Sequence, residues 1–203
     1  MIKSTGIIIF FFITSIALPS SAMAREINYD YIQGTYRSFT DSSPGTDVNA
    51  DGFAINGSFG ATSNLAIVAG YGTRDYDRHL GLDVNFTELN LGLTSHSSIT
   101  PETDIFGSFS VLKVEGEIDD GSTTTSDSDT GNTISVGLRH MINNTVELNA
   151  SLTRENIFDD TIIINSFGAR LYASEIFSVG VGYFTGNDDV DAILLNVRID
   201  FKK

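Results

Sequence analysis

Apolar and polar residues alternate along the C-terminal segment 191–201. Ile193, Leu195 and Val197 belong to a series of apolar residues at every second position, and most residues between them are polar. Because the side chains of a β-strand alternate between its two faces, this segment has one apolar and one mostly polar face. Its eleven residues exceed the about 5–6 of an average soluble strand and match the about 9–11 of a strand that crosses a bilayer. The pattern therefore predicts a transmembrane β-strand.

The same alternation recurs along most of the chain. It is found in nine further segments, at residues 27–39, 52–60, 65–73, 84–94, 104–115, 132–141, 145–153, 162–172 and 177–184. The expected fold class is all-β, an antiparallel up-and-down transmembrane β-barrel. Ten strands are expected, with eight as the alternative if one weak hairpin is not formed.

The connections between these segments alternate in length. Those at 61–64, 142–144 and 173–175 are short, 95–102 is somewhat longer, and 40–51, 74–83, 116–131, 155–161 and 185–190 are mostly longer and acidic. Outer-membrane barrels have short periplasmic turns and longer outer loops. The pattern therefore predicts periplasmic termini, short periplasmic turns and longer acidic loops on the outside.

The chain begins with the features of an export signal. Lys3 precedes an apolar run at residues 6–18, and Ala22 and Ala24 supply small residues before a cleavage point. The apolar run is shorter than the about 20 residues of a membrane helix, and its flanks are those of a secretory signal peptide. Residues 1–24 are therefore expected to be a cleaved signal peptide, and residues 25–203 an outer-membrane β-barrel domain.

Composition excludes several classes of function. The formal net charge is −14, and it becomes −15 when the single lysine of residues 1–24 is removed. Nucleic acid is therefore not an expected partner, because its binding needs basic patches. The chain contains no cysteine, so neither disulfides nor thiol chemistry are available.

The polar faces of the predicted strands combine small residues with a few charges. Glycine and serine are frequent there, and the charged residues are Glu88, Arg139, Glu147, Arg170 and Arg198. Such a set suits a narrow lumen in which opposite charges pair, whereas a solvent-facing sheet carries denser lysine and glutamate. A soluble periplasmic ligand-binding barrel, with its apolar face inward, is the structural alternative.

Three local features carry a resemblance to a known family. They are the opening Asn-Tyr-Asp-Tyr-Ile-Gln-Gly-Thr-Tyr at residues 28–36, the Asp-Gly-Phe at residues 51–53, and the aromatic end of the last strand. In these the chain resembles the small outer-membrane β-barrel proteins of proteobacteria, the OmpA/OmpX-type, porin-like superfamily. The resemblance implies the outer membrane of a Gram-negative bacterium but no single activity, since members of one fold serve many roles.

The resemblance also implies partners. They are outer-membrane lipid, lipopolysaccharide and the barrel-assembly machinery, which recognises a terminal aromatic strand. Ile199 and Phe201 are the matching assembly signal here, and this chain departs from the family pattern by adding Lys202 and Lys203 after Phe201. The oligomeric state is left open, because no outward face stands out as an interface.

No catalytic site is expected. The histidines are His79, His96 and His140, and His79 lies in a predicted outer loop beside Asp77 and Arg78. No second acidic pair with a fixed spacing accompanies this cluster, and no serine lies in a nucleophile-elbow context. The histidines are expected to be hydrated residues of loops and of the membrane interface. No cofactor is expected.

A weak candidate for a metal site lies in the first predicted outer loop. Asp47, Asn49 and Asp51, followed by Gly52, match the first half of a calcium-binding loop. Position twelve of that pattern is Ser58 instead of glutamate, so the full motif is not present. The acidic loops together give a second hypothesis, that they recruit divalent ions which bridge to lipopolysaccharide phosphates.

The expected function is therefore a non-enzymatic structural or surface-interaction role. A narrow porin-like channel for small solutes or ions is the alternative. An interior of about eight to ten strands is nearly filled by side chains, whereas open porins use about 16–18 strands. The lumenal arginines and glutamates are accordingly expected to form a plug, or else the lining of a narrow path.

Overall fold

The computed structural model describes residues 26–43, 46–79, 81–187 and 189–201, and the predicted signal peptide lies outside these residues. The described chain forms ten β-strands. They are β1 (Tyr31–Ser43), β2 (Thr46–Gly60), β3 (Leu65–His79), β4 (Leu82–Thr100), β5 (Thr103–Asp119), β6 (Thr124–Asn143), β7 (Val146–Ile157), β8 (Asp160–Tyr172), β9 (Phe177–Gly186) and β10 (Val190–Asp200). None of the described residues lies in a helix that is long and apolar enough to cross a bilayer.

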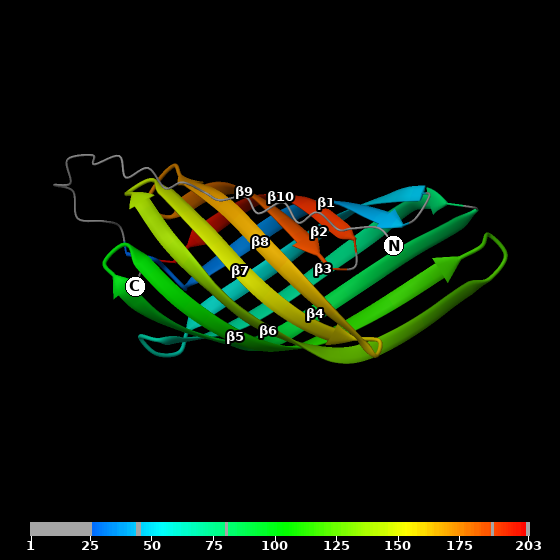
Figure 1. The fold of residues 1–203 in the computed structure, drawn as a ribbon, viewed down its shortest axis with the longest axis horizontal. Coiled ribbons are helices and arrows are strands. Elements are labelled where there is room, and N and C mark those ends of the chain that lie inside the picture. Colours follow the sequence, from blue (N-terminus) through cyan, green and yellow to red (C-terminus); the bar gives the residue numbers. More distant parts are fainter. Residues whose placement is uncertain (1–25, 44–45, 80, 188, 202–203) are drawn as a thin grey trace, which may run out of the picture.

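The strands form one closed antiparallel barrel in which each strand pairs with its neighbours in sequence (Figure 1). Closure comes from β1 and β10, where Tyr31 lies opposite Asp200 and Asp41 opposite Val190. A closed sheet has no free edge, so every strand has a hydrogen-bonded neighbour on both sides. The predicted all-β up-and-down barrel is confirmed, with ten strands and not eight.

The outward face of the barrel is an apolar belt. Phe53, Leu91 and Ile193 are 65%, 62% and 57% exposed. Further exposed members of the belt are Ile55, Ile67, Leu89, Phe109, Ile134, Leu152, Phe167, Val181 and Leu195. Apolar exposure on this scale suits lipid and not water. The alternative of a soluble barrel with its apolar face inward is therefore wrong.

Two tyrosines mark the outer boundary of this belt. The Tyr36 hydroxyl donates to Asp51 at 2.6 Å, and the Tyr183 hydroxyl donates to Asp191 at 2.9 Å. Each ring continues the apolar face of its strand while the hydroxyl reaches a carboxylate beyond it. This is the amphipathic arrangement that places tyrosine at a membrane–water interface.

The strands extend further outward than the sequence pattern predicted. The segments expected to be long acidic loops are mostly strand: β5 ends at Asp119 and β6 resumes at Thr124, and β7 ends at Ile157 before β8 begins at Asp160. The alternation signal fades there because both faces of a hairpin outside the membrane contact water. The backbone pairing nevertheless continues, because it does not depend on side-chain polarity.

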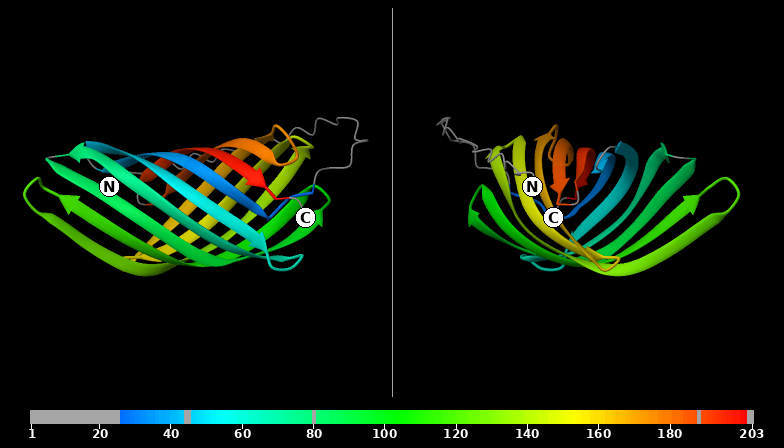
Figure 2. Two further views of the ribbon diagram at one scale, coloured as in Figure 1. Left: turned by 180° about the vertical axis from the view of Figure 1, so that it is seen from behind. Right: turned by 45° about the vertical axis from the view of Figure 1, so that its right-hand side comes forward.

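The longest strands form a lip on one side of the outer mouth. Strands β4, β5 and β6 contain 19, 17 and 20 residues, whereas β9 and β10 contain 10 and 11. The hairpin of β5 and β6 consequently reaches farthest at the end opposite the C-terminus (Figures 1 and 2). The inner face of this lip is therefore not covered by an equally long wall.

The first strand begins later than the pattern predicted. Residues 27–30 precede β1, and Ile27, Tyr29 and Asp30 are buried. Tyr29 packs with Ile27 in a cluster completed by Ala66, Met141 and Tyr172. By sequence, Tyr29 and Tyr31 at the start of this strand are expected to be interfacial aromatics, whereas the structure places both inside the barrel. Tyr29 is in the buried cluster, and Tyr31 lies in the lining of an interior cavity.

Candidate functional site in the barrel lumen

The lumen near the termini contains a buried ion pair. Arg139 donates from Nε and Nη2 to the two carboxylate oxygens of Glu147, at 3.0 and 2.9 Å. Because Met141 lies opposite Glu147 in the β6–β7 register, Arg139 is its diagonal neighbour on the inward face. The Tyr172 hydroxyl also donates to Glu147, at 2.7 Å. The carboxylate is thus held from both adjacent strands.

A backbone carbonyl of the N-terminal segment joins this pair to a second arginine. The Asn28 carbonyl accepts from Arg139 at 2.9 Å and from Arg198 at 2.7 Å. Arg198 also donates to Asp200 on its own strand, from Nε at 2.8 Å. The guanidinium of Arg198 lies 3.8 Å from the ring centre of Tyr31, in cation–π geometry. The segment before β1 is therefore fixed inside the mouth by two cations.

The same segment is fixed on its other side by aromatic packing. The rings of Tyr29 and His96 stack at 3.6 Å with an interplanar angle of 9°. His96 Nδ1 lies 4.0 Å from the carboxylate of Asp104, which also accepts from the Ser98 hydroxyl at 2.7 Å. His96 was expected in a turn, but it lies on β4 and its ring contacts the lumenal Tyr29.

Arg170 lies in the same part of the lumen with neutral partners. It donates to the Ser178 hydroxyl at 3.2 Å and to the Gln33 side-chain carbonyl at 2.6 Å. These bonds run from β8 to its neighbour β9 and across the interior to β1. Arg170 therefore links β8 to β1, which are not adjacent in the wall.

A second ion cluster lies nearer the outer mouth. Glu88 accepts from Arg37 at 2.9 Å and from Arg74 at 3.1 Å, so one carboxylate serves two guanidinium groups. The guanidinium of Arg74 lies 4.3 Å from the ring centre of Phe39. Arg37 also donates to the Thr73 carbonyl at 3.1 Å. The cluster connects β1, β3 and β4 across the lumen.

Asparagines and glycines separate the two charged clusters. Gly70 lies between Asn56 and Asn90 in the sheet register. A Cβ atom at Gly70 would lie 2.3 Å from Asn56 Oδ1 and 2.7 Å from Asn90 Nδ2. Asn149 and Asn196 likewise lie opposite glycines of neighbouring strands. The glycines leave room for amide side chains to lie flat against the wall.

Cavities lie between these lumenal side chains. One of about 330 Å³ is bordered by Arg139, Arg170 and Arg198, and one of about 250 Å³ is bordered by Arg37 and Glu88. Gln33, Asn56 and Asn90 line both cavities. The middle of the lumen is thus polar and incompletely filled, with an ion cluster at each end.

The comparison with protein families places the chain. A family model described as outer membrane protein beta-barrel domain matches residues 10–184. The chain belongs to this family. Proteins of this family are located in the outer membrane, and the apolar belt is consistent with a lipid environment. No curated protein sequence matches the chain at a significant level.

The barrel domains of two autotransporters share the fold at low sequence identity. The translocator domain of the autotransporter NalP from Neisseria meningitidis is 9% identical, with 88% of this chain and 90% of that chain covered and a TM-score of 0.54. The β-domain of the Bordetella autotransporter BrkA is 11% identical, with coverages of 85% and 99% and a TM-score of 0.53. Neisserial surface protein A is 12% identical, with coverages of 84% and 96% and a TM-score of 0.48.

The structure brings some predicted lumenal residues together and separates others. Arg139 and Glu147 contact each other, Arg198 joins them through Asn28, and Arg170 takes its hydrogen bonds elsewhere in the same region. Glu88 belongs to the outer cluster. Sequence analysis did not identify the remaining members of the two clusters, which are Arg37, Arg74, Asp200, Tyr172 and the Asn28 carbonyl. Arg37 continues the every-second-residue series of Tyr31, Gln33 and Thr35, so the alternation along this strand could have placed it in the lumen.

The candidate metal residues lie on a strand and not in a loop. Asp47, Asn49 and Asp51 alternate along β2 with exposed side chains, and Asp51 accepts from Tyr36. Side chains at every second position of a strand are about 6–7 Å apart, too far to share one cation in the manner of a calcium loop. The described residues contain no group of three or more histidine, cysteine or acidic side chains that could hold a metal.

The predicted histidines are dispersed. His140 is exposed and bonds Thr103 at 2.8 Å, while His96 stacks on Tyr29. The side chain of His79 lies outside the described residues. Phe201, predicted to carry the assembly signal with Ile199, stacks on Phe59 at 5.7 Å.

Proposed function

We propose that this protein is a non-enzymatic outer-membrane barrel with a closed lumen, which contributes to envelope structure and presents its outer hairpins for surface interaction. The observation that carries the proposal is the occupied mouth near the termini. There the Asn28 carbonyl is bound by Arg139 and Arg198, and Ile27 and Tyr29 are buried. A segment fixed in the mouth of the barrel would obstruct conduction through the lumen.

The energetics of the two ion clusters support a structural role. Charges enclosed in a narrow space are costly unless they are paired and hydrogen-bonded. Glu147 accepts from Arg139 and Tyr172, and Glu88 accepts from Arg37 and Arg74. These bonds cross between strands and fix the register of the wall. We infer that lumenal polarity serves to specify and close the barrel.

The outer hairpins support the surface role. Beyond the apolar belt, the outward face of β5 changes from Val111 to Lys113, Glu115 and Glu117. The wall therefore continues into water as paired strands and not as flexible loops. Outer-membrane lipid and lipopolysaccharide are the proposed surroundings of the belt, and the barrel-assembly machinery is the proposed partner during insertion.

The test is planar-bilayer conductance of the refolded protein after removal of the signal peptide. Heat-modifiable migration on a gel first verifies that the barrel is folded. The wild-type protein is expected to give no discrete steps. A variant lacking residues 26–30 keeps β1 but loses the Asn28 carbonyl and the Tyr29 ring, and is expected to conduct. Regular steps from the intact protein would overturn the closed-lumen proposal.

A narrow channel is the second candidate, and the cavities favour it. The two cavities share Gln33, Asn56 and Asn90 in their linings, so they adjoin in mid-lumen. Buried Arg170 Nε and Asn196 Oδ1 have no hydrogen-bond partner among the described protein atoms, which suits a hydrated space. In this case the segment before β1 would be a gate, and reversing the charge of Arg139 would shift ion selectivity.

A further inference from the structure

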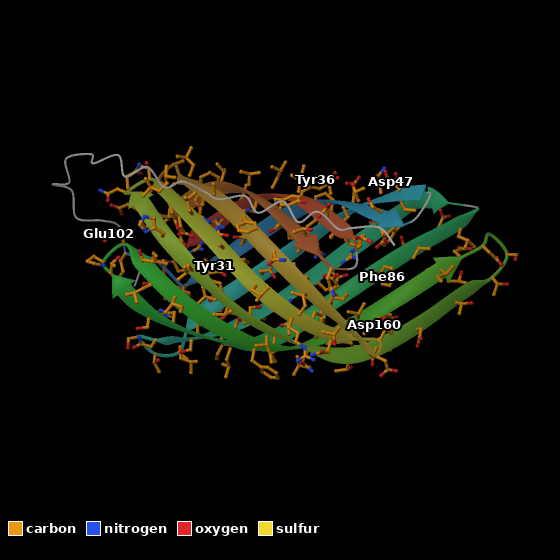
Figure 3. All side chains as sticks on the ribbon, viewed as in Figure 1. Tyr31, Tyr36, Asp47, Phe86, Glu102 and Asp160 are labelled. Carbon is orange, nitrogen blue, oxygen red and sulfur yellow. The ribbon has the colours of Figure 1, made fainter. Side chains whose placement is uncertain are left out.

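The lip formed by β4, β5 and β6 contains an apolar groove on its inner face. We call it the outer-rim groove; it has a volume of about 270 Å³ and is lined by Phe86, Gly116, Ile118, Thr125, Asp127 and Phe158. Phe158 comes from the connection between β7 and β8, so the groove lies where the lip meets that hairpin. Figure 3 labels Phe86 and Asp160 in the half of the barrel that lies away from Glu102.

The groove is built on a packed apolar base but is itself open. Leu112, Val114 and Ile157 are buried, with Phe86 packed against them. Ile118 and Phe158, one step farther out, are 46% and 39% exposed. The base holds the groove in shape, and the two exposed side chains offer apolar surface to a partner.

This apolar surface lies outside the lipid belt. On the outward face of β5, the apolar Val111 is followed by charged residues up to Glu117. Ile118 lies beyond them and its neighbour across β6 is Thr125. An apolar groove at this height faces water, so lipid tails do not cover it.

The backbone at Phe158 holds the ring in place at a conformational cost. Phe158 and Asp159 have φ values of 50° and 61°, in the left-handed region that bulky residues rarely adopt. The Phe158 amide donates to the Asp129 carboxylate at 2.6 Å. An Asn-Gly or Asp-Gly sequence would form such a two-residue turn at lower cost. The phenylalanine is therefore not explained by the turn alone.

The charge around the groove is mainly negative, because Arg74, which lies opposite Phe86 on β3, is paired with Glu88. Between residues 114 and 138 the chain carries acidic side chains but no lysine, arginine or histidine, and the same holds from 155 to 169. Asp127 lines the groove itself, and Asp129 and Asp160 lie on the neighbouring segments. Anionic ligands such as lipid phosphates are disfavoured by this field, and cationic ones are attracted.

We propose that the outer-rim groove docks a basic amphipathic peptide segment of a partner protein, with an apolar side chain inserted between Ile118 and Phe158 and flanking cations facing the acidic rim. Apolar contact supplies the anchor, and charge supplies orientation and association rate. This inference rests on the proposed surface role of the outer hairpins and names the chemistry that they recognise.

The test measures binding of synthetic peptides to the barrel in zwitterionic nanodiscs by fluorescence anisotropy. The probe is a labelled peptide of alternating lysine and leucine or phenylalanine residues. Two control peptides replace all apolar residues by serine, or all lysines by glutamate. The probe is expected to bind in a salt-dependent manner, and both controls at least about tenfold more weakly.

The barrel variants locate the site. Ile118→Ser and Phe158→Gly are each expected to weaken the probe about tenfold, and glycine accepts the positive φ of position 158 without strain. The matched control is Ile99→Ser, an exposed isoleucine at the opposite end of β4. The proposed docking would be overturned if all three variants bound the probe with equal affinity. It would also be overturned if the serine control peptide bound as tightly as the probe. Conductance tests the closed lumen separately, so a silent barrel without peptide binding rejects only this inference.

Discussion

Arg139 of β6 and Glu147 of β7 meet inside the barrel through two hydrogen bonds of 3.0 and 2.9 Å, and their side chains are only 8% and 2% exposed. The pair lies beside Arg198, which binds the same Asn28 carbonyl. Glu147 therefore offsets the positive charge of Arg198 as well as that of Arg139, which it contacts directly. The stability of the lumen near the termini should depend on this carboxylate.

We expect Glu147→Gln to destabilise the folded barrel by about 3–5 kcal/mol, because Arg139 is left buried without its counter-charge. Urea titration of the refolded barrel in detergent, followed by heat-modifiable migration, measures the change. The control is Glu117→Gln on the exposed outward face of β5, with an expected change within about 0.5 kcal/mol. Equal midpoints for the two variants would show that the pair contributes nothing net.

The outer cluster differs from the Arg139–Glu147 pair, because its single carboxylate, Glu88, is shared by Arg37 and Arg74. Removing either arginine leaves an ion pair, so Arg37→Met and Arg74→Met are each expected to cost about 1 kcal/mol. Glu88→Gln leaves two guanidinium groups facing each other and is expected to cost about 2–3 kcal/mol, less than Glu147→Gln because Glu88 is 21% exposed. Urea titration of the three variants should place Glu88→Gln as the least stable. A larger loss for either arginine variant would contradict the sharing.

A glycine on β2 gives a prediction about close packing of the wall. A Cβ atom at Gly52 would lie 2.1 Å from the Thr73 carbonyl oxygen, which also accepts from Arg37. Gly52→Ala must displace backbone and is expected to cost about 1–3 kcal/mol. At Gly34 the nearest atom to a new Cβ is Val197 Cγ2, at 3.7 Å, so Gly34→Ala is expected to change stability by less than about 0.5 kcal/mol. The urea midpoints of both variants test this contrast, which would fail if they shifted equally.

The sequence predicted the transmembrane part of each strand because the two faces of the wall meet different surroundings there. Alternation along 191–201 and along 145–153 reflects lipid on one side and a polar lumen on the other. The outer ends of β5 and β6 meet water on both sides, so residues 116–131 carried no alternation and were assigned to a loop. These strands continue because their backbones pair, and the alternation of apolar and polar side chains gives no information about that pairing.

The alternation along each strand predicted which residues face the lumen, but not which of them contact each other. The inward phase of β6 and β7 placed Arg139 and Glu147 inside, but their contact depends on a register fixed by the tight turn after Asn143. The Arg37–Glu88–Arg74 cluster depends on side chains reaching across the interior between β1 and β4, which are not neighbours. Alternation through Tyr29 suggested that the strand began at residue 27, whereas the chain there turns into the mouth and packs on Met141 and Tyr172.

The final aromatic residue gives a prediction that separates assembly from stability. Phe201 stacks on the exposed ring of Phe59 at 5.7 Å, and its amide donates to the Asp30 carbonyl at 2.8 Å. Phe201→Ala and Phe59→Ala remove the same ring contact and should reduce urea stability in detergent by similar amounts, about 1 kcal/mol. If the assembly machinery recognises the last aromatic residue itself, only Phe201→Ala will slow insertion in cells. Pulse-labelled accumulation of the heat-modifiable form measures that rate. Equal slowing by both variants would mean that insertion depends on the packed pair of rings and that Phe201 has no separate role as a recognition signal.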